Sequence, residues 1–367
     1  MNFITRSITT LAAAALLAAP GERSLFEKAT AALQRGDLPA ARAGFEAVLA
    51  ADPRNLPALG NLAVVCARQA DYAKAEKLYR RALALAPANP ILELNLGLAL
   101  FKQQRFQDAA PHFRRVLSKQ PAHAQARELL VTSLIQTGRA AEALDLLAPA
   151  PADDGVLYLR GLALSRLGRH DEARRTFESL FQVTTPARAR YLSGRAHAEA
   201  GAYEQALADL EEAARLDPSL EGVHRAAAKA LIALRRYDEA SAHLARALQR
   251  DPHDIESRYL RGAIHVQLAE WIQGRGELDR VVQERPASWG THYYLGRAFL
   301  GERNAAAAVK ALEQAAALAP DRAPVFFQLV RAYQMAGRAQ DAARARERLT
   351  ALRTAEANDE KTLLESQ

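Results

Sequence analysis

A spacing of 34 residues recurs along this chain and limits what it can fold into. Prolines mark the interval in two series, at Pro53, Pro87 and Pro121 and then at Pro218, Pro252, Pro286 and Pro320. A period this short is typical of an array in which one supersecondary unit is repeated and stacked, rather than of two or three globular domains. If the recurrent proline is numbered position 32, ten units begin near residues 22, 56, 90, 124, 154, 187, 221, 255, 289 and 323.

Side-chain volume is kept at three further positions of the unit. Small residues occupy position 8, at Ala29, Ala63, Gly97, Gly161, Gly194, Ala228, Gly262 and Gly296. Alanine occupies position 20, at Ala41, Ala75, Ala109, Ala143, Ala173, Ala206, Ala240, Ala308 and Ala342. Large apolar residues occupy position 24, at Phe45, Tyr79, Phe113, Leu147, Phe177, Leu210, Leu244, Leu278 and Leu312. Because packing depends on volume, this pattern indicates paired helices that approach closely at small residues, beside a bulky one.

Each unit is predicted to be a helical hairpin. Two stretches of about 14 residues carry apolar residues three and four apart. The turn between them often has Gly at position 15, as at Gly36, Gly138, Gly168, Gly201 and Gly337. The proline near position 32 ends the second helix, because it lacks an N–H group and clashes with the preceding turn. A single hairpin cannot bury its apolar faces, so we expect neighbouring hairpins to share a continuous core.

These shared positions make the chain similar to tetratricopeptide repeat proteins over about residues 22–354. The resemblance implies an all-α fold, a right-handed α-solenoid superhelix of helix-turn-helix repeats whose first helices line a concave groove. There are three departures from the family pattern. Trp is absent from position 4 throughout, Gly274 replaces Ala at position 20 of the eighth unit, and Arg346 replaces the large apolar residue of the tenth. The polar Arg346 suits a last unit that no neighbour covers.

An irregular joint divides the array into repeats 1–4, residues 22–153, and repeats 5–10, residues 154–354. The joint has the sequence LAPAPADDG, in which two prolines and two aspartates replace the last turn of a helix. We therefore expect a bend between residues 148 and 155. Residues 355–367 form a charged tail that we expect to be disordered.

The first 21 residues differ from the rest of the chain. MNFITRS carries one positive charge, Ile8 to Ala19 is a short apolar stretch, and small residues surround Pro20 and Gly21, which is the layout of a secretory signal peptide. The apolar part is too short to span a bilayer as a helix. We therefore expect a periplasmic or secreted protein, with no stable membrane insertion once the signal is removed. The alternative is an alanine-rich leader on a cytoplasmic protein.

The sequence contains no recognisable catalytic motif. It lacks GxxxxGK[ST], GxSxG and HExxH, and its nine histidines never pair at i and i+4. His197, His265 and the only cysteine, Cys66, all lie at position 11, where units pack against one another. Packing roles are therefore favoured for them over metal binding or a reactive thiol. We predict that the protein is not an enzyme and that it uses no metal or cofactor.

The resemblance implies that positions 2, 5, 9 and 12 of the first helices point into the groove. The first half of the groove would then be mostly apolar, and the second half would mix aromatic rings with cations, the side chains that anchor protein interfaces. The expected partner-binding residues are Leu94, Leu98, Phe101, Tyr158, Leu162, Arg188, Tyr191, Arg195, Arg225, Lys229, Tyr259, Tyr293, Arg297, Phe327 and Arg331. A protein or peptide with acidic side chains would satisfy both halves. Tyrosine at position 5 is also common in the family for packing alone.

Some members of the family hold the carboxyl-terminal carboxylate of chaperones, using Lys at position 5 and Asn at position 9 of one unit and further polar residues in the next two. Asn61 and Asn95 stand at position 6 of two units, but Phe26 and Thr30 occupy the positions of the first Lys and Asn. This clamp is not present, so a chaperone tail is not the expected partner.

The charge balance leaves the type of partner open. The formal charge of +7 results from 49 basic and 42 acidic residues, and 41 of the basic residues are Arg, whose planar fork suits carboxylates and phosphates. The excess is spread along the chain without a run of like charges, which is typical of solvated helix faces. The leading interpretation is a non-catalytic scaffold or adaptor in envelope assembly, polysaccharide export or secretion. The alternatives are a cytoplasmic nucleic-acid or ribonucleoprotein factor, and a helper subunit of an enzyme complex.

Overall fold

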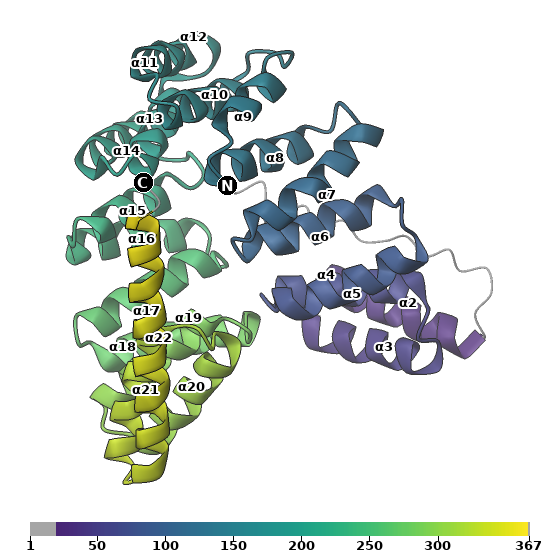
Figure 1. Ribbon diagram of the computed structural model, residues 1–367, viewed down its shortest axis with the longest axis vertical. Coiled ribbons are helices and arrows are strands. Elements are labelled where there is room, and N and C mark those ends of the chain that lie inside the picture. Colours follow the sequence, from purple (N-terminus) through teal and green to yellow (C-terminus); the bar gives the residue numbers. More distant parts are fainter. Residues whose placement is uncertain (1–19, 366–367) are drawn as a thin grey trace. The chain divides into compact units, whose positions relative to one another are not determined.

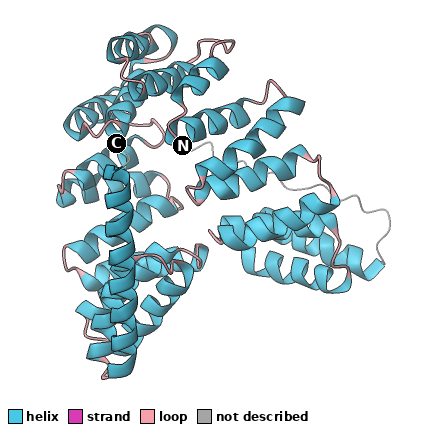
Figure 2. Ribbon diagram, in the orientation of Figure 1, coloured by secondary structure: helices cyan, strands magenta, loops and turns pink. Residues whose placement is uncertain are grey.

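The computed structural model describes the backbone of residues 20–365, and no strand occurs in this range (Figure 2). The first helices of the units are α2 (Pro20–Arg35), α4 (Leu56–Arg68), α6 (Pro90–Lys102), α8 (Ala124–Gln136), α10 (Asp154–Arg166), α13 (Pro186–Glu199), α15 (Val223–Ala233), α17 (Ile255–Gln267), α19 (Trp289–Gly301) and α21 (Ala323–Met335). The second helices are α3 (Leu38–Ala51), α5 (Tyr72–Leu85), α7 (Phe106–Lys119), α9 (Ala140–Leu147), α11 (His170–Glu178) with the short α12 (Leu180–Val183), α14 (Tyr203–Leu216), α16 (Tyr237–Arg250), α18 (Trp271–Glu284), α20 (Ala305–Leu318) and α22 (Ala339–Glu365). The predicted all-α fold of tandem helical hairpins is confirmed. The predicted signal peptide falls on residues 1–21, of which 1–19 lie outside the described residues.

The turn at position 15 has the same backbone conformation in every unit. The residue there has a positive φ whether it is a glycine, as at Gly36 with 80°, or another residue, as at Ala70 with 63°. The next residue then donates its backbone N–H to the carbonyl five residues earlier, as from Asp71 to Cys66 at 2.8 Å. This bond satisfies a carbonyl at the end of the first helix, as in a Schellman motif. The turn geometry therefore repeats even where the glycine does not.

The glycines at position 8 lie against the bulky residue at position 24, as their volumes predict. A Cβ atom added to Gly161 would come within 2.4 Å of the Phe177 ring, and one added to Gly296 would come within 2.4 Å of Leu312. These distances are shorter than any van der Waals contact, so the two helices of the hairpin could not keep their separation with a larger residue. The small residue at position 8 and the large residue at position 24 therefore mark, in the sequence, where the two helices of a hairpin are in contact.

Charged pairs cross several hairpins at position 4, where the family pattern has Trp. Arg190 donates to Asp209 at 2.8 Å. Arg258 donates to Glu277 at 2.9 Å. In both hairpins the acid lies at position 23 of the second helix, so the pair joins the two helices. Ion pairs here occupy the place of an aromatic packing contact.

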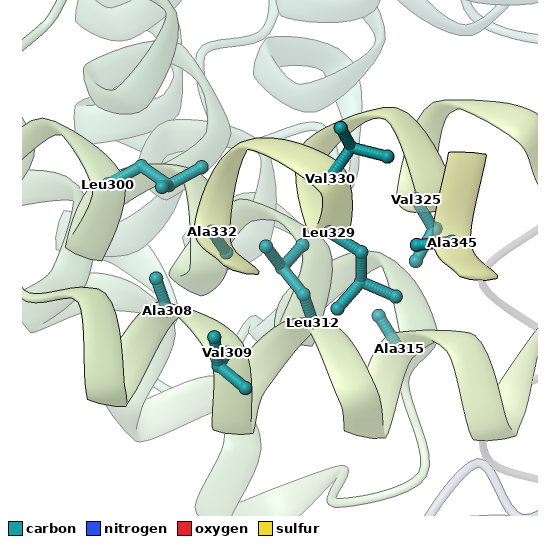
Figure 3. Packing of buried hydrophobic residues seen from close by; sticks show 10 residues of the cluster. All are labelled: Leu300, Ala308, Val309, Leu312, Ala315, Val325, Leu329, Val330, Ala332 and Ala345. Atoms are coloured by element: carbon teal, nitrogen blue, oxygen red, sulfur yellow. The ribbon is translucent and has the colours of Figure 1, made fainter. Parts of the chain in front are cut away.

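The chain forms two compact units that divide between Ala230 and Leu231, inside α15. Within each unit, consecutive helices pack in chain order (Figure 1). In the second compact unit, one apolar cluster contains side chains from α19, α20, α21 and α22, among them Leu300, Leu312, Leu329 and Ala345 (Figure 3). Neighbouring hairpins thus share their core, as expected for a stacked array.

Two segments bear on the predicted boundaries. Helix α9 has eight residues where α5, α7 and α14 have 14, and no helix covers residues 148–153, so the predicted interruption is confirmed. The bend itself stays a prediction. Helix α22 continues to Glu365 and so runs through most of the segment 355–367, for which disorder stays a prediction. This segment has neither Gly nor Pro, and a helix already nucleated by packing elongates readily through Ala, Leu and Glu.

Candidate functional site

The strongest cluster of predicted groove residues in the first compact unit lies on α10 and α13. The guanidinium carbon of Arg195 lies 4.7 Å from the centre of the Tyr158 ring and 5.7 Å from that of Tyr191. Arg188 also lies over Tyr191, at 5.6 Å, and donates to Asp154 at 3.0 Å. The structure therefore brings four of the predicted residues together, with cations against the faces of tyrosine rings.

Burial separates the members of this cluster. Tyr158 and Tyr191 are buried, with 6% and 7% of their surfaces exposed. Burial raises the pKa of the Tyr158 hydroxyl to about 12, which keeps it neutral. Arg188 and Arg195 remain partly exposed, and so does Leu162. The two tyrosine rings thus lie buried beneath the arginines, and the arginines are the groups that a partner can reach.

On α15, where the two compact units meet in sequence, the predicted residues are cationic. Arg225 is partly buried and Lys229 is exposed. Both make polar or charged interactions within the molecule. They add positive charge next to α13 in the sequence.

The second compact unit carries a second cluster, on α17, α19 and α21. Arg297 lies 5.8 Å from the ring centre of Tyr293 and donates to the side-chain oxygen of Gln267 at 3.2 Å. Arg331 is exposed and donates to the side-chain oxygen of Gln328 at 3.0 Å. Phe327, one turn before Arg331, leaves 44% of its surface exposed. Successive first helices therefore present an aromatic ring and a cation at positions 5 and 9.

Tyr259 has a packing role instead. Its ring is in edge contact with Tyr294 of α19, with ring centres 6.0 Å apart. Burial raises the pKa of the Tyr259 hydroxyl well above its usual range. This tyrosine links two neighbouring first helices, which is the packing alternative that the sequence left open.

The expected apolar wall of the first half is not open to a partner. Leu94, Leu98 and Phe101 leave only 4%, 2% and 3% of their surfaces exposed. Phe101 packs in the hairpin interior, in edge contact with Phe106 and Phe113 of α7 at ring distances of 5.0 and 6.4 Å. All residues from 92 to 101 in α6 are buried. A helix that is apolar all round is a buried helix, so these side chains do not form a binding surface.

Sequence reasoning missed two features near the predicted sites. Trp289, at position 1 of the ninth unit, leaves 37% of its surface exposed, and the Arg322 guanidinium lies 5.4 Å from its ring centre. It extends the aromatic and cationic pattern of α19 by one turn. The truncation of α9 also leaves an open pocket of about 590 Å³, lined by residues that include Leu157, Arg160 and Arg175. The repeat period could have indicated both features, because Trp289 lies at the start of a first helix and the pocket lies beside a shortened repeat.

Among the described residues, no group of three His, Cys, Asp or Glu side chains is placed to hold a metal ion. Cys66 is buried, and burial raises the pKa of its thiol to about 11. No helix in this part of the chain combines the length and the apolar character that crossing a membrane requires.

Stacked helical hairpins with aromatic and cationic first-helix faces define a helical repeat protein of the interaction type. Two family models described as tetratricopeptide repeat match the chain, one over residues 26–90 and 158–221 and the other over residues 100–163 and 197–264. Together they span more than half of the chain, and the protein belongs to the tetratricopeptide repeat family. Such repeats generally mediate protein–protein interactions, and the fold is typically a non-catalytic scaffold.

One solved structure supports the same fold, and two others have weaker similarity. A chain of the APC/C hetero-tetramer Cut9-Hcn1 is similar with 15% sequence identity and a TM-score of 0.50, covering 90% of this chain and 93% of that chain. The MamA RS-1 ArsTM double mutant has 21% identity and a TM-score of 0.45, covering 47% and 97%. MamA 41-end from Desulfovibrio magneticus RS-1 has 23% identity and a TM-score of 0.42, covering 48% and 97%. The similarity to the Cut9-Hcn1 chain shows the fold alone, and no curated protein matches the sequence.

Proposed function

We propose that this protein is an exported adaptor whose first helices bind a polypeptide with acidic side chains. One observation carries the proposal: α21 exposes the aromatic ring of Phe327 and the cation of Arg331 one turn apart, and α19 places Tyr293 and Arg297 at the same positions. An exposed Phe327 keeps a large apolar area in water, and an interface would bury it. Aromatic and Arg side chains are the types that anchor protein interfaces.

The cations of this surface support an acidic partner. Arg297 and Arg331 each donate to a glutamine side chain, and neither forms an ion pair with the described residues. Many other arginines of the second compact unit do form ion pairs with acids, as Arg275 does with Glu302 at 3.0 Å. Carboxylates of a partner would therefore find charged donors that the fold itself does not pair with an acid.

A triple variant tests the surface. Replacing Arg297, Phe327 and Arg331 with Ala should abolish partner capture from native extract, because it removes one apolar anchor and two cations. The matched control replaces Ile272, Arg280 and Lys310 with Ala, an exposed apolar residue and two exposed cations on the second helices α18 and α20. Mass spectrometry should identify a protein retained by the wild type and the control but lost from the triple variant. Equal retention by all three would remove the assignment.

Salt dependence separates this proposal from the nucleic-acid alternative. Phosphate contacts release counterions. The logarithm of the binding constant for nucleic acid should therefore fall steeply and linearly with the logarithm of the salt concentration. An interface with a large apolar part should lose much less affinity as the salt concentration rises, because burial of apolar area does not depend on counterions. Capture that survives added salt supports the polypeptide. Capture of nucleic acid that salt abolishes would contradict it.

Export is proposed from the leader sequence, of which residues 1–19 fall outside the described residues. If residues 1–21 are a signal peptide, the protein purified from its native source should begin near residue 22. Sequencing of the amino terminus measures this directly. An intact leader on the purified protein would favour the cytoplasmic alternative.

A further inference from the structure

Arg195 is a partly buried cation for which the fold supplies no counter-ion. It forms no ion pair and donates no hydrogen bond within the described residues. Glu199 and Glu128 act on it electrostatically, but neither forms an ion pair with it. Its neighbours on α13 differ, because Arg188 pairs with Asp154 and Arg190 pairs with Asp209. Of the two predicted groove cations on α13, Arg195 is thus the one that forms no ion pair with the described residues.

Two tyrosine rings hold the Arg195 side chain in place. With the Tyr158 ring centre at 4.7 Å and the Tyr191 ring centre at 5.7 Å, the guanidinium lies against both rings. Contacts with ring faces partly compensate for lost water, but they use none of the five N–H donors of the guanidinium. A carboxylate is the group that accepts two of these donors in parallel.

We propose that Arg195, set between Tyr158 and Tyr191, is a receptor for one carboxylate of the bound polypeptide. This inference rests on the proposed function, and it names the chemistry of one contact. The carboxylate belongs either to an Asp or Glu side chain or to a chain terminus. The arrangement differs from the carboxylate clamp described for the family, because a single cation at position 9 is held by tyrosines at position 5 of its own repeat and of the preceding one.

A peptide selection tests the receptor. The probe is a library of random acetylated decapeptides, once with an amidated carboxyl terminus and once with a free one, applied to immobilised full-length protein. Selection of Asp or Glu at a fixed place in the amidated library identifies a side-chain carboxylate. Selection from the free-carboxylate library alone identifies a terminal one. Either result supports the proposal if it depends on Arg195.

The dependence is measured with variants. Arg195→Gln should weaken the best peptide by roughly tenfold to a hundredfold, the loss expected for a hydrogen bond to a charged group. Replacing the peptide's carboxylate with its amide should cause a similar loss in the wild type and little further loss in Arg195→Gln. Arg166→Gln, an exposed arginine on α10, is the matched control and should bind like the wild type. An acid preference that survives in Arg195→Gln would overturn the receptor but leave the peptide surface intact. A library from which the wild type enriches no sequence would overturn the proposed function as well.

Thermal unfolding without peptide gives a second, independent readout. A cation with no partner in the fold can be replaced by Met, which also packs against aromatic rings, without loss of melting temperature. Arg190→Met should lower the melting temperature, because it leaves Asp209 buried without that partner. If Arg195→Met lowers the melting temperature as much as Arg190→Met does, Arg195 has a structural role and the proposal fails.

Discussion

At the scale of single residues, the turn at position 15 shows the fold overriding local preference. Five units use glycine there, which adopts positive φ without steric cost. The other five place Ala, Gln or Arg in the same left-handed region, with φ between 59° and 63°. Such residues carry strain of about 1 kcal/mol or more. The period locates these turns in the sequence, but Ala70 or Ala269 alone would predict a continuing helix.

Relief of this strain is the first prediction. Ala269→Gly should raise the free energy of unfolding by about 1 kcal/mol, because glycine removes the clash of the Cβ atom with its own backbone. Urea unfolding measures the change. Ala317→Gly, at an exposed site within α20, is the control and should lower it by about 1 kcal/mol. A loss of stability in Ala269→Gly as large as in the control would contradict the strain.

Asp209 is a second test at the residue scale. Burial would raise the pKa of its carboxyl, but hydrogen bonds from His197, Ser193 and Arg190 outweigh this and hold the pKa below its usual range. A carboxyl with a lowered folded pKa stabilises the protein above its unfolded pKa, and this contribution is lost as pH falls. Asp209→Asn should therefore cost about 1 to 3 kcal/mol at pH 7. The gap to the wild type should narrow below about pH 4.

Unfolding by urea at pH 7 and at a lower pH where both proteins remain folded measures this gap. Asp238→Asn is the control, since Asp238 is exposed on α16, and it should show little loss at either pH. A gap for Asp209→Asn that does not change with pH would show that its hydrogen bonds, and not its charge, set the stability.

At the scale of the hairpin, helix separation depends on one small residue facing one large residue. Gly296 of α19 faces Leu312 of α20 with no room for a Cβ atom, whereas Gly276 of α18 has no atom within 4 Å of that position. The two glycines lie within helices of consecutive hairpins of the same compact unit, Gly296 buried and Gly276 exposed. Their different surroundings predict opposite effects of the same substitution.

Gly296→Ala should lower the free energy of unfolding by about 1 to 3 kcal/mol, because the added methyl group overpacks the hairpin. Gly276→Ala should raise it by about 0.5 to 1 kcal/mol through helix propensity alone. Calorimetry or urea unfolding measures both. An equal effect of the two substitutions would mean that position 8 does not set the contact between helices.

Packing was predictable from the sequence because volume repeats along it, and exposure was predictable only in part. The helix boundaries follow the period closely, since prolines and left-handed turns recur at fixed positions. In α6 the same period placed Leu94 and Leu98 in the groove, yet both are buried. The residues around them, LELNLGLALF, include almost no polar face, and that absence was the available signal of a buried helix.

At the scale of the whole molecule, the proposal places binding on the exposed faces of the first helices of each compact unit. Positions 5 and 9 of these helices hold buried residues in some repeats and exposed ones in others, so the sequence alone could not separate candidate binding residues from packing residues. Tyr259 contacts another ring, whereas Phe327 is exposed and Arg195 lacks a counter-ion. Those distinctions depend on neighbours from other repeats, which no single repeat contains. Protein interaction is the function that the family and these exposed faces share.

Hydrogen exchange with and without the captured partner tests the central claim most directly. The full-length protein, saturated with the polypeptide retained from native extract, should show slower amide exchange in α13, α19 and α21 than the free protein, with little change in α14 and α20. Slower exchange confined to the second helices, or no change in α13, α19 and α21, would contradict binding by the first helices.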